Sequence, residues 1–182
     1  MTSNFKQNTT IIITVVFLMF SCQMVRKENI KKIIQEWYGK EILIPTEIEY
    51  RILGRDTASS ALWDRPYKIF NYIDSIGCSS CQLGLFKWKM LIDSCNLQQL
   101  DVGILFVIHS SDYDLLSWDL KENHFNHPVI YDYNNQFDKL NHFPPVPYRT
   151  FLLDKDNKVK LIGSPIDSPQ IWELYKKEIK QQ

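Results

Sequence analysis

Two cysteines separated by two serines, Cys78 and Cys81, are the residues of this chain whose type and spacing point most directly to chemistry. They follow the apolar segment Tyr67 to Ile73, which predicts a buried strand, and they open a segment with helical periodicity. Free backbone N–H groups and the dipole at the start of a helix stabilise a thiolate. We therefore expect Cys78 to ionise readily and attack a disulfide, and Cys81, one turn further along, to resolve the mixed disulfide.

The first 21 residues predict a short export signal, with Lys6 as the only charge and an apolar run over residues 11–20. This run is too short to span a bilayer. The sequence Leu-Met-Phe-Ser-Cys that ends at Cys22 resembles a bacterial lipoprotein box, which implies cleavage before Cys22 and attachment of lipid to its thiol. An ordinary secretory signal and an uncleaved interfacial anchor remain alternatives.

The composition indicates a compact domain without a nucleic-acid surface. Among 182 residues, 21 are basic and 21 acidic, and the basic residues are scattered except for a cluster over residues 176–180. Hydrophobic residues make up 45% of the chain, enough for a core in one domain. Cys95, on a mainly apolar stretch, is expected to be a buried free thiol.

The pattern of apolar residues predicts helices and strands in alternation. The continuous apolar run from Gly103 to Ile108 is typical of a strand covered on both faces. Helices are expected over residues 27–38, from about Ser79 to Ser94 with Leu83, Phe86, Met90 and Leu91 facing inward, from a cap at Asp112 to about Glu122, and over Pro169 to Ile179. Strands are expected at Glu41 to Ile44, Ile48 to Leu53, Tyr67 to Ile73, Val102 to His109, Val129 to Tyr131, Arg149 to Leu153 and Val159 to Gly163, with a polar loop at Thr57 to Ser60 and a turn or short helix at Asn134 to Leu140. The order predicts an α/β fold: a central mixed sheet with helices on both faces and a C-terminal antiparallel hairpin, preceded by an N-terminal helix and short strands.

Over roughly residues 64–180 the chain resembles the thioredoxin-like fold, and more narrowly the envelope-anchored thiol/disulfide oxidoreductases of the TlpA type. The cysteine pair lies at a strand-to-helix turn, as in that family. Val146 and Pro147, followed by Thr150 to Asp154 and Val159 to Gly163, are similar to its cis-proline loop, strand and hairpin, and His127 to Asp132 is similar to the extra strand of this branch.

The resemblance implies a role for each site residue. Cys78 is the attacking thiol, Cys81 the resolving thiol, and Pro147 a cis-proline that faces them, while the backbone of Val146 pairs with the extended chain of the partner. It also implies three segments: a signal peptide over 1–21, an N-terminal helix and extended segment that packs on the domain over 22–63, and the thioredoxin-like domain over 64–182.

The chain departs from the family at two kinds of position. It has Gly77 and Ser80 where many thioredoxin-like enzymes have a tryptophan before the first cysteine and a proline between the two. At the usual offset of the buried proton-accepting carboxylate it has Tyr72, and Asp74 is nearer but is expected on a different register. Without that carboxylate, water or another group would have to carry the proton of Cys81.

Three other readings of the cysteine pair remain open. It could form a structural disulfide, although closing so short a loop restricts the unfolded chain little. It could bind copper or zinc with one of four histidines, His109, His124, His127 or His142, none of which has a regular metal spacing. The fold could also serve as a redox-inert binding module.

The expectation for the whole protein is thiol/disulfide exchange with a partner protein, without a cofactor or bound metal. We expect it to be anchored by lipid in the bacterial cell envelope, facing the periplasm. Because that compartment is oxidising, reduction there requires a membrane redox donor that regenerates the dithiol.

Overall fold

The computed structural model of the chain describes residues 27–57, 60–75 and 83–181. Cys22, Cys78 and Cys81 lie outside these residues, so their predicted roles stay predictions. The chain divides into two units, up to Trp37 and from Tyr38 onward, and each is described by itself. In the first unit, residues 27–37 form a helix, as the periodicity predicts.

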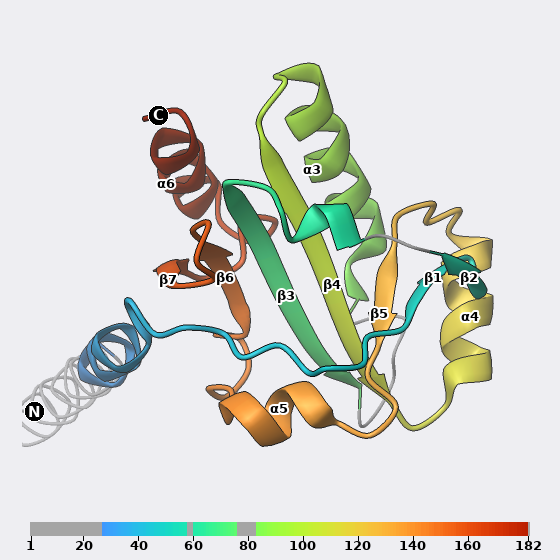
Figure 1. Cartoon of the computed structure of the whole chain (residues 1–182). Helices are drawn as coiled ribbons and strands as arrows, with labels where there is room; N and C mark the ends of the chain where they lie inside the picture. The colour runs from blue at the N-terminus through green and yellow to red at the C-terminus, as the bar shows by residue number, and fades with distance from the viewer. Residues whose placement is uncertain (1–26, 58–59, 76–82, 182) are drawn as a thin grey trace, which may run out of the picture. The chain divides into compact units, whose positions relative to one another are not determined.

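Within the described residues, seven strands form one mixed sheet in the order β2-β1-β5-β4-β3-β6-β7 (Figure 1). Strand β4 lies in the middle and pairs in parallel with β3 and β5, while the remaining neighbours are antiparallel. The predicted mixed sheet and its C-terminal hairpin, β6 and β7, are therefore confirmed. The strands are β1 (Tyr50–Ile52), β2 (Arg55–Thr57), β3 (Tyr67–Ser75), β4 (Val102–Ser110), β5 (Val129–Tyr131), β6 (Thr150–Leu153) and β7 (Val159–Ile162).

Two helices begin at the residues that the sequence predicts, and in each the residue before the helix caps it. Asp112 accepts a hydrogen bond from the N–H of Leu115 at 2.9 Å and starts α4, and Ser168 accepts one from the N–H of Ile171 at 3.3 Å and starts α6. Such side chains satisfy backbone donors that have no partner inside the helix. The helices are η1 (Ser60–Leu62), α3 (Leu85–Leu97), α4 (Tyr113–Glu122), α5 (Gln136–Asn141) and α6 (Pro169–Ile179).

Strand β2 was not predicted, and the helix expected to run unbroken from about Ser79 to Ser94 is interrupted at Gly84. Residues 55–57, partly assigned to a polar loop, form an edge strand whose charged side chains hide the alternation of a strand. The expected strand at Glu41 to Ile44 is reduced to a single bridge between Glu41 and Lys158. Gly84, in a left-handed conformation with φ 55°, precedes α3 and interrupts the helical phase that was counted from the cysteine pair.

This interruption changes which side of α3 faces the core. Phe86 and Met90, predicted to point inward, are 72% and 59% exposed. Leu85 and Trp88 are buried instead, together with Leu91 as predicted. Since α3 carries apolar residues on every side, its periodicity did not identify a unique inner face.

The core lies on both faces of the sheet, as expected for an α/β fold. On one face, buried side chains of α3, α4 and α6 pack with Ile69, Phe106 and Leu152 from the central strands. On the other, Phe70 is surrounded by aromatic rings at centroid distances of 5.7–6.3 Å, those of Trp63, Phe137, Phe143 and Phe151. Together these layers hold the C-terminal ends of β3 and β4 at one edge of the sheet.

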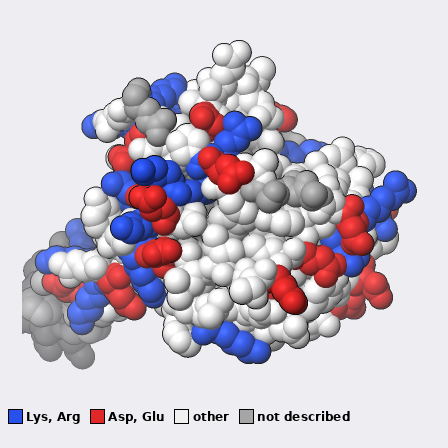
Figure 2. Space-filling view, in the orientation of Figure 1, with Lys and Arg blue, Asp and Glu red and all other residues white. Residues whose placement is uncertain are grey.

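On the face drawn in Figure 2, basic and acidic side chains are intermixed, and no area of a single sign stands out. This distribution agrees with the equal numbers of basic and acidic residues in the sequence. Of the helices in the described part of the chain, none is long and apolar enough to cross a membrane.

Candidate functional site

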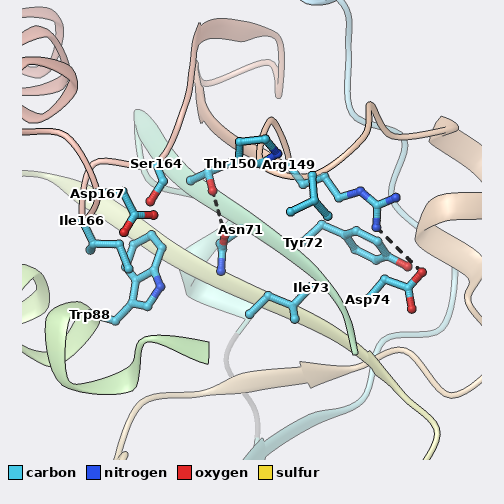
Figure 3. Close-up of a pocket in the computed structure, with 12 residues that line it drawn as sticks. Asn71, Tyr72, Ile73, Asp74, Trp88, Arg149, Thr150, Ser164, Ile166 and Asp167 are labelled. Carbon is cyan, nitrogen blue, oxygen red and sulfur yellow. Dashed lines mark hydrogen bonds and ion pairs between the residues drawn. The ribbon is translucent and has the colours of Figure 1, made fainter. Parts of the chain in front are cut away.

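The candidate site lies where β3 ends and where the chain returns to begin β6. Strand β3 runs to Ser75, three residues before Cys78 in the sequence, and the described chain resumes at Leu83. The bond between Val146 and Pro147 is cis, in agreement with the implied cis-proline, and both residues line a pocket of about 290 Å³. The end of β3 lines the same pocket (Figure 3).

Backbone pairing brings the loop of Val146 and Pro147 to the end of β3. The N–H of Tyr72 donates to the carbonyl of Arg149 at 3.0 Å, and Asn71 stands opposite Thr150 in the antiparallel register. The position of the loop is therefore set by the last rungs of the β3–β6 ladder.

Arg149 fixes this loop with its side chain as well. Its Nε donates to the carbonyl of Pro144 at 2.8 Å, and its Nη1 lies 3.8 Å from Oδ2 of Asp74. Its guanidinium also stands over the ring of Tyr72, 5.6 Å from the centroid. The Arg149 side chain thus connects the proline-rich loop to Tyr72 and Asp74 near the C-terminal end of β3.

Tyr72 and Asp74 have different environments. The hydroxyl of Tyr72 donates to Oδ1 of Asn135, and burial is the largest cause that raises the pKa of this phenol above its ordinary value. The Oδ1 atom of Asp74 is buried and has no hydrogen-bond partner among the described residues. Tyr72 is therefore a neutral donor, whereas Asp74 has one buried oxygen that accepts no hydrogen bond from the described residues.

The expectation that Asp74 lies on a different register was wrong. Strand β3 continues to Ser75, beyond the predicted end at Ile73, and side chains two residues apart on a strand leave the same face. Asp74 therefore shares the face of Tyr72, one step closer to the cysteine pair, with Arg149 beside both.

Asn71, Trp88 and Thr150 were not identified as site residues from the sequence. All three line the pocket, on the side of β3 that faces α3. The Thr150 hydroxyl donates to Oδ1 of Asn71 at 2.8 Å. An uncharged polar residue within the apolar strand was the one signal for Asn71, while the approach of Trp88 depends on the phase of α3.

Two of the four histidines bond to backbone carbonyls. The Nδ1 atom of His109 lies 2.8 Å from the Asp132 oxygen, and Nε2 of His127 lies 2.7 Å from the Ile104 oxygen. Burial lowers the pKa of His127. Across residues 27–57, 60–75 and 83–181, no three side chains of His, Cys, Asp or Glu are grouped as metal ligands would be.

No protein-family model and no curated protein sequence matches this chain. Its structure is similar to that of the thioredoxin domain of a thiol-disulfide oxidoreductase from Bacteroides vulgatus, with a TM-score of 0.58 and 14% identity over 79% of this chain and 98% of the other. It is also similar to a protein described as the thiol:disulfide interchange protein DsbE from Chlorobium tepidum, with a TM-score of 0.58 and 14% identity over 78% and 96% of the two chains. For StoA from Bacillus subtilis the TM-score is 0.50, with 17% identity over 71% and 99%.

At these identities the likeness establishes the fold. The strand order, the helices on both faces and the hairpin at the edge agree with it. The chain therefore has the thioredoxin-like fold that its sequence resembles.

Proposed function

We propose that this protein exchanges disulfides with a partner protein through Cys78 and Cys81. The observation that carries the proposal is the pocket that Val146 and Pro147 share with the end of β3, the strand that leads directly into the cysteine pair. The structural neighbours described as thiol-disulfide oxidoreductases add support through their shared fold.

The reaction is a pair of thiol–disulfide exchanges. The Cys78 thiolate attacks one sulfur of a partner disulfide, the partner's S–S bond breaks, and the departing partner thiolate takes up a proton. Cys81 then loses its proton and attacks the sulfur of Cys78, which releases the second partner thiolate. The partner gains two electrons and two protons, and Cys78 and Cys81 become a disulfide.

Val146 is suited to hold the partner during these steps. Its side chain is 73% exposed, and no hydrogen bond among the described residues engages its backbone. An extended partner chain can pair with such free backbone groups, as in strand addition to a sheet edge. The role assigned to Val146 and Pro147 is therefore to align the partner backbone beside Cys78.

A second part of the proposal concerns location. Cys22 carries lipid and anchors the protein in the bacterial envelope, with the domain facing the periplasm. Since that compartment is oxidising, a membrane-bound dithiol donor returns the disulfide to the dithiol after each cycle. This part rests on the amino-terminal sequence.

The experiment compares the purified protein with three cysteine variants in the reduction of a model protein disulfide by a small dithiol. Cys78→Ser is expected to abolish turnover, and Cys81→Ser to accumulate the mixed disulfide on Cys78. Cys95→Ala is the matched control, because Cys95 is buried in the core, and turnover is expected to persist in it. Equal turnover in Cys78→Ser and the unmodified protein would refute the proposal and favour the binding module.

A further inference from the structure

The pocket beside Val146 and Pro147 contains two hydrogen-bond donors that the exchange reaction does not use. Asn71 is 7% exposed and Trp88 is 2% exposed, and both line the pocket. In Figure 3 the amide nitrogen of Asn71 and the indole nitrogen of Trp88 face the same space. Neither nitrogen donates to a partner within the described part of the chain.

The orientation of the Asn71 amide follows from its neighbour. The Thr150 hydroxyl donates to Oδ1 of Asn71 at 2.8 Å, so this oxygen is turned toward β6. The Nδ2 group, with its two N–H donors, is consequently directed away from Thr150 and into the pocket (Figure 3). These two N–H groups have no partner among the described residues, so they are available to an acceptor oxygen that enters the pocket.

The charges around the pocket favour an uncharged group. Among the described lining residues the cation is Arg149, which Asp74 already engages at 3.8 Å. Asp167, on another wall, is paired with Lys87 at 3.1 Å. A carboxylate that entered beside Trp88 would lie close to Asp167 without a free cation, whereas a neutral amide carries no charge for Asp167 to repel.

The other walls of the pocket provide groups that can bind the N–H₂ group and the methylene groups of an amide side chain. Asp167 and Ser164 offer acceptor oxygens, and Figure 3 places both at the end of the pocket where Trp88 lies. Ile166 and the ring of Trp88 offer apolar contact for methylene groups. At about 290 Å³ the pocket is at the lower limit of the ~300–1,000 Å³ that holds a small molecule, which suits a single side chain.

From these features we infer that the pocket is a specificity subsite for a primary amide side chain, glutamine or asparagine, adjacent to the reacting cysteine of the partner. The amide oxygen accepts from Nδ2 of Asn71 and Nε1 of Trp88, and the amide N–H₂ donates to Asp167 or Ser164. This inference rests on the proposed exchange function, because Val146 and Pro147 hold the partner beside the subsite.

The test uses the Cys81→Ser protein, in which a mixed disulfide on Cys78 persists. Four blocked peptides, each with an activated disulfide on its single cysteine, differ only in the neighbouring residue: Gln, Glu, Leu or Lys. The peptides are made with that residue before and after the cysteine. We expect the Gln peptide to form the mixed disulfide about five-fold faster than the Leu and Glu peptides, the effect of a net hydrogen bond or two.

The variants Asn71→Asp and Trp88→Phe are expected to lose this preference. Asn71→Asp keeps the acceptor for Thr150 but removes the N–H₂ group, and Trp88→Phe removes the indole N–H but keeps an aromatic ring against Phe106. Trp118→Phe, on the exposed surface of α4, is the matched control and is expected to keep the preference. Circular dichroism establishes folding, and Thr150→Val, which releases the Asn71 amide, replaces any variant that fails to fold.

The outcomes of this experiment test the amide subsite and the exchange function independently of each other. Equal rates with all four peptides would overturn the subsite and leave the exchange function standing. If no peptide forms a mixed disulfide, the exchange function fails, and the subsite is judged by titrating the protein with the same peptides carrying serine for cysteine. Tighter binding of the Gln peptide, abolished by Asn71→Asp, would then support the subsite, and equal binding of all four would overturn it.

Discussion

At the scale of single residues, Arg149 determines how the proline-rich loop meets the end of β3. It bonds to the Pro144 carbonyl, lies beside Asp74 and stacks on Tyr72. A planar guanidinium can donate hydrogen bonds in its plane while its face stacks on a ring, whereas an ammonium group has no flat face to stack.

Replacing Arg149 is therefore expected to affect both stability and exchange. Arg149→Ala leaves the partly buried Asp74 unpaired, and the free energy of unfolding should fall by about 1–3 kcal/mol in urea titrations. The rate of exchange should fall as well, because the loop of Val146 loses its support. The control is Asp74→Asn in the Arg149→Ala background, which should recover stability; an unchanged Arg149→Ala protein would show that the contacts are dispensable.

Cys95 gives a prediction about alkaline pH. It is a free, buried cysteine, as the sequence predicts, and burial raises the pKa of its thiol from 9.0 to about 11. Folding therefore favours the protonated form: its contribution to stability is complete below pH 9 and is lost as pH rises toward 11. The loss amounts to about 2–3 kcal/mol.

The measurement compares urea unfolding of the protein and Cys95→Ala between pH 8 and 11. Ionisation of buried tyrosines such as Tyr175 destabilises both proteins equally at high pH. The difference between the two plots of unfolding free energy against pH therefore reports on Cys95 alone. We expect a steeper loss in the unmodified protein. Parallel curves would mean that the thiol ionises as freely in the folded state as in the unfolded state.

Site residues that are adjacent in the sequence were identified more readily than site residues that are distant in the sequence and come together only in the folded chain. Val146 and Pro147 were identified through the resemblance of their loop to the cis-proline loop of a known family, and the structure shows a cis bond between them at the edge of the pocket. Asn71, Trp88 and Arg149 come from a strand, a helix and a loop, and they approach one another only because of sheet register and helix phase. Neither the sheet register nor the helix phase can be deduced from the identity of a single residue.

At the scale of elements, α3 shows how one backbone conformation changes a helix. Gly84 has φ 55°, which favours glycine, and a Cβ atom there would lie 3.2 Å from Cδ1 of Ile166. Since this residue separates α3 from the preceding segment, apolar positions counted from the cysteine pair do not identify the buried side. Strands β4 and β5 and helix α6, which contain no such interruption, were predicted to within a residue.

The adjacent residues Met90 and Leu91 test the observed orientation of α3. Leu91 is buried and Met90 exposed. Leu91→Ala should lower the free energy of unfolding by about 2–5 kcal/mol, because it leaves a cavity in the core. Met90→Ala should change it by less than about 0.5 kcal/mol, since it lies on the surface and alanine favours helix. Urea titrations check both, and a similarly large loss in both variants would restore the orientation expected from the sequence, in which both residues face inward.

At the scale of the whole molecule, the mixed sheet explains why one edge carries the site. Parallel β3 and β4 end together, and the antiparallel β6 begins beside the end of β3. The alternation of helices and strands was enough to predict the mixed sheet and its terminal hairpin. The attachment of β1 and β2 beside β5 was not predictable, because a three-residue polar strand leaves little pattern in the sequence.

In the proposed function, Cys78 and Cys81 interconvert between a dithiol and a disulfide. The most direct measurement is peptide mapping by mass spectrometry after the purified protein has equilibrated with buffers of graded thiol/disulfide ratio. We predict that the peptide containing Cys78 and Cys81 reversibly loses and regains a pair of hydrogens, while Cys95 remains a thiol. A pair that keeps one state across all buffers, or that forms its bonds with Cys95, would rule out the proposed exchange.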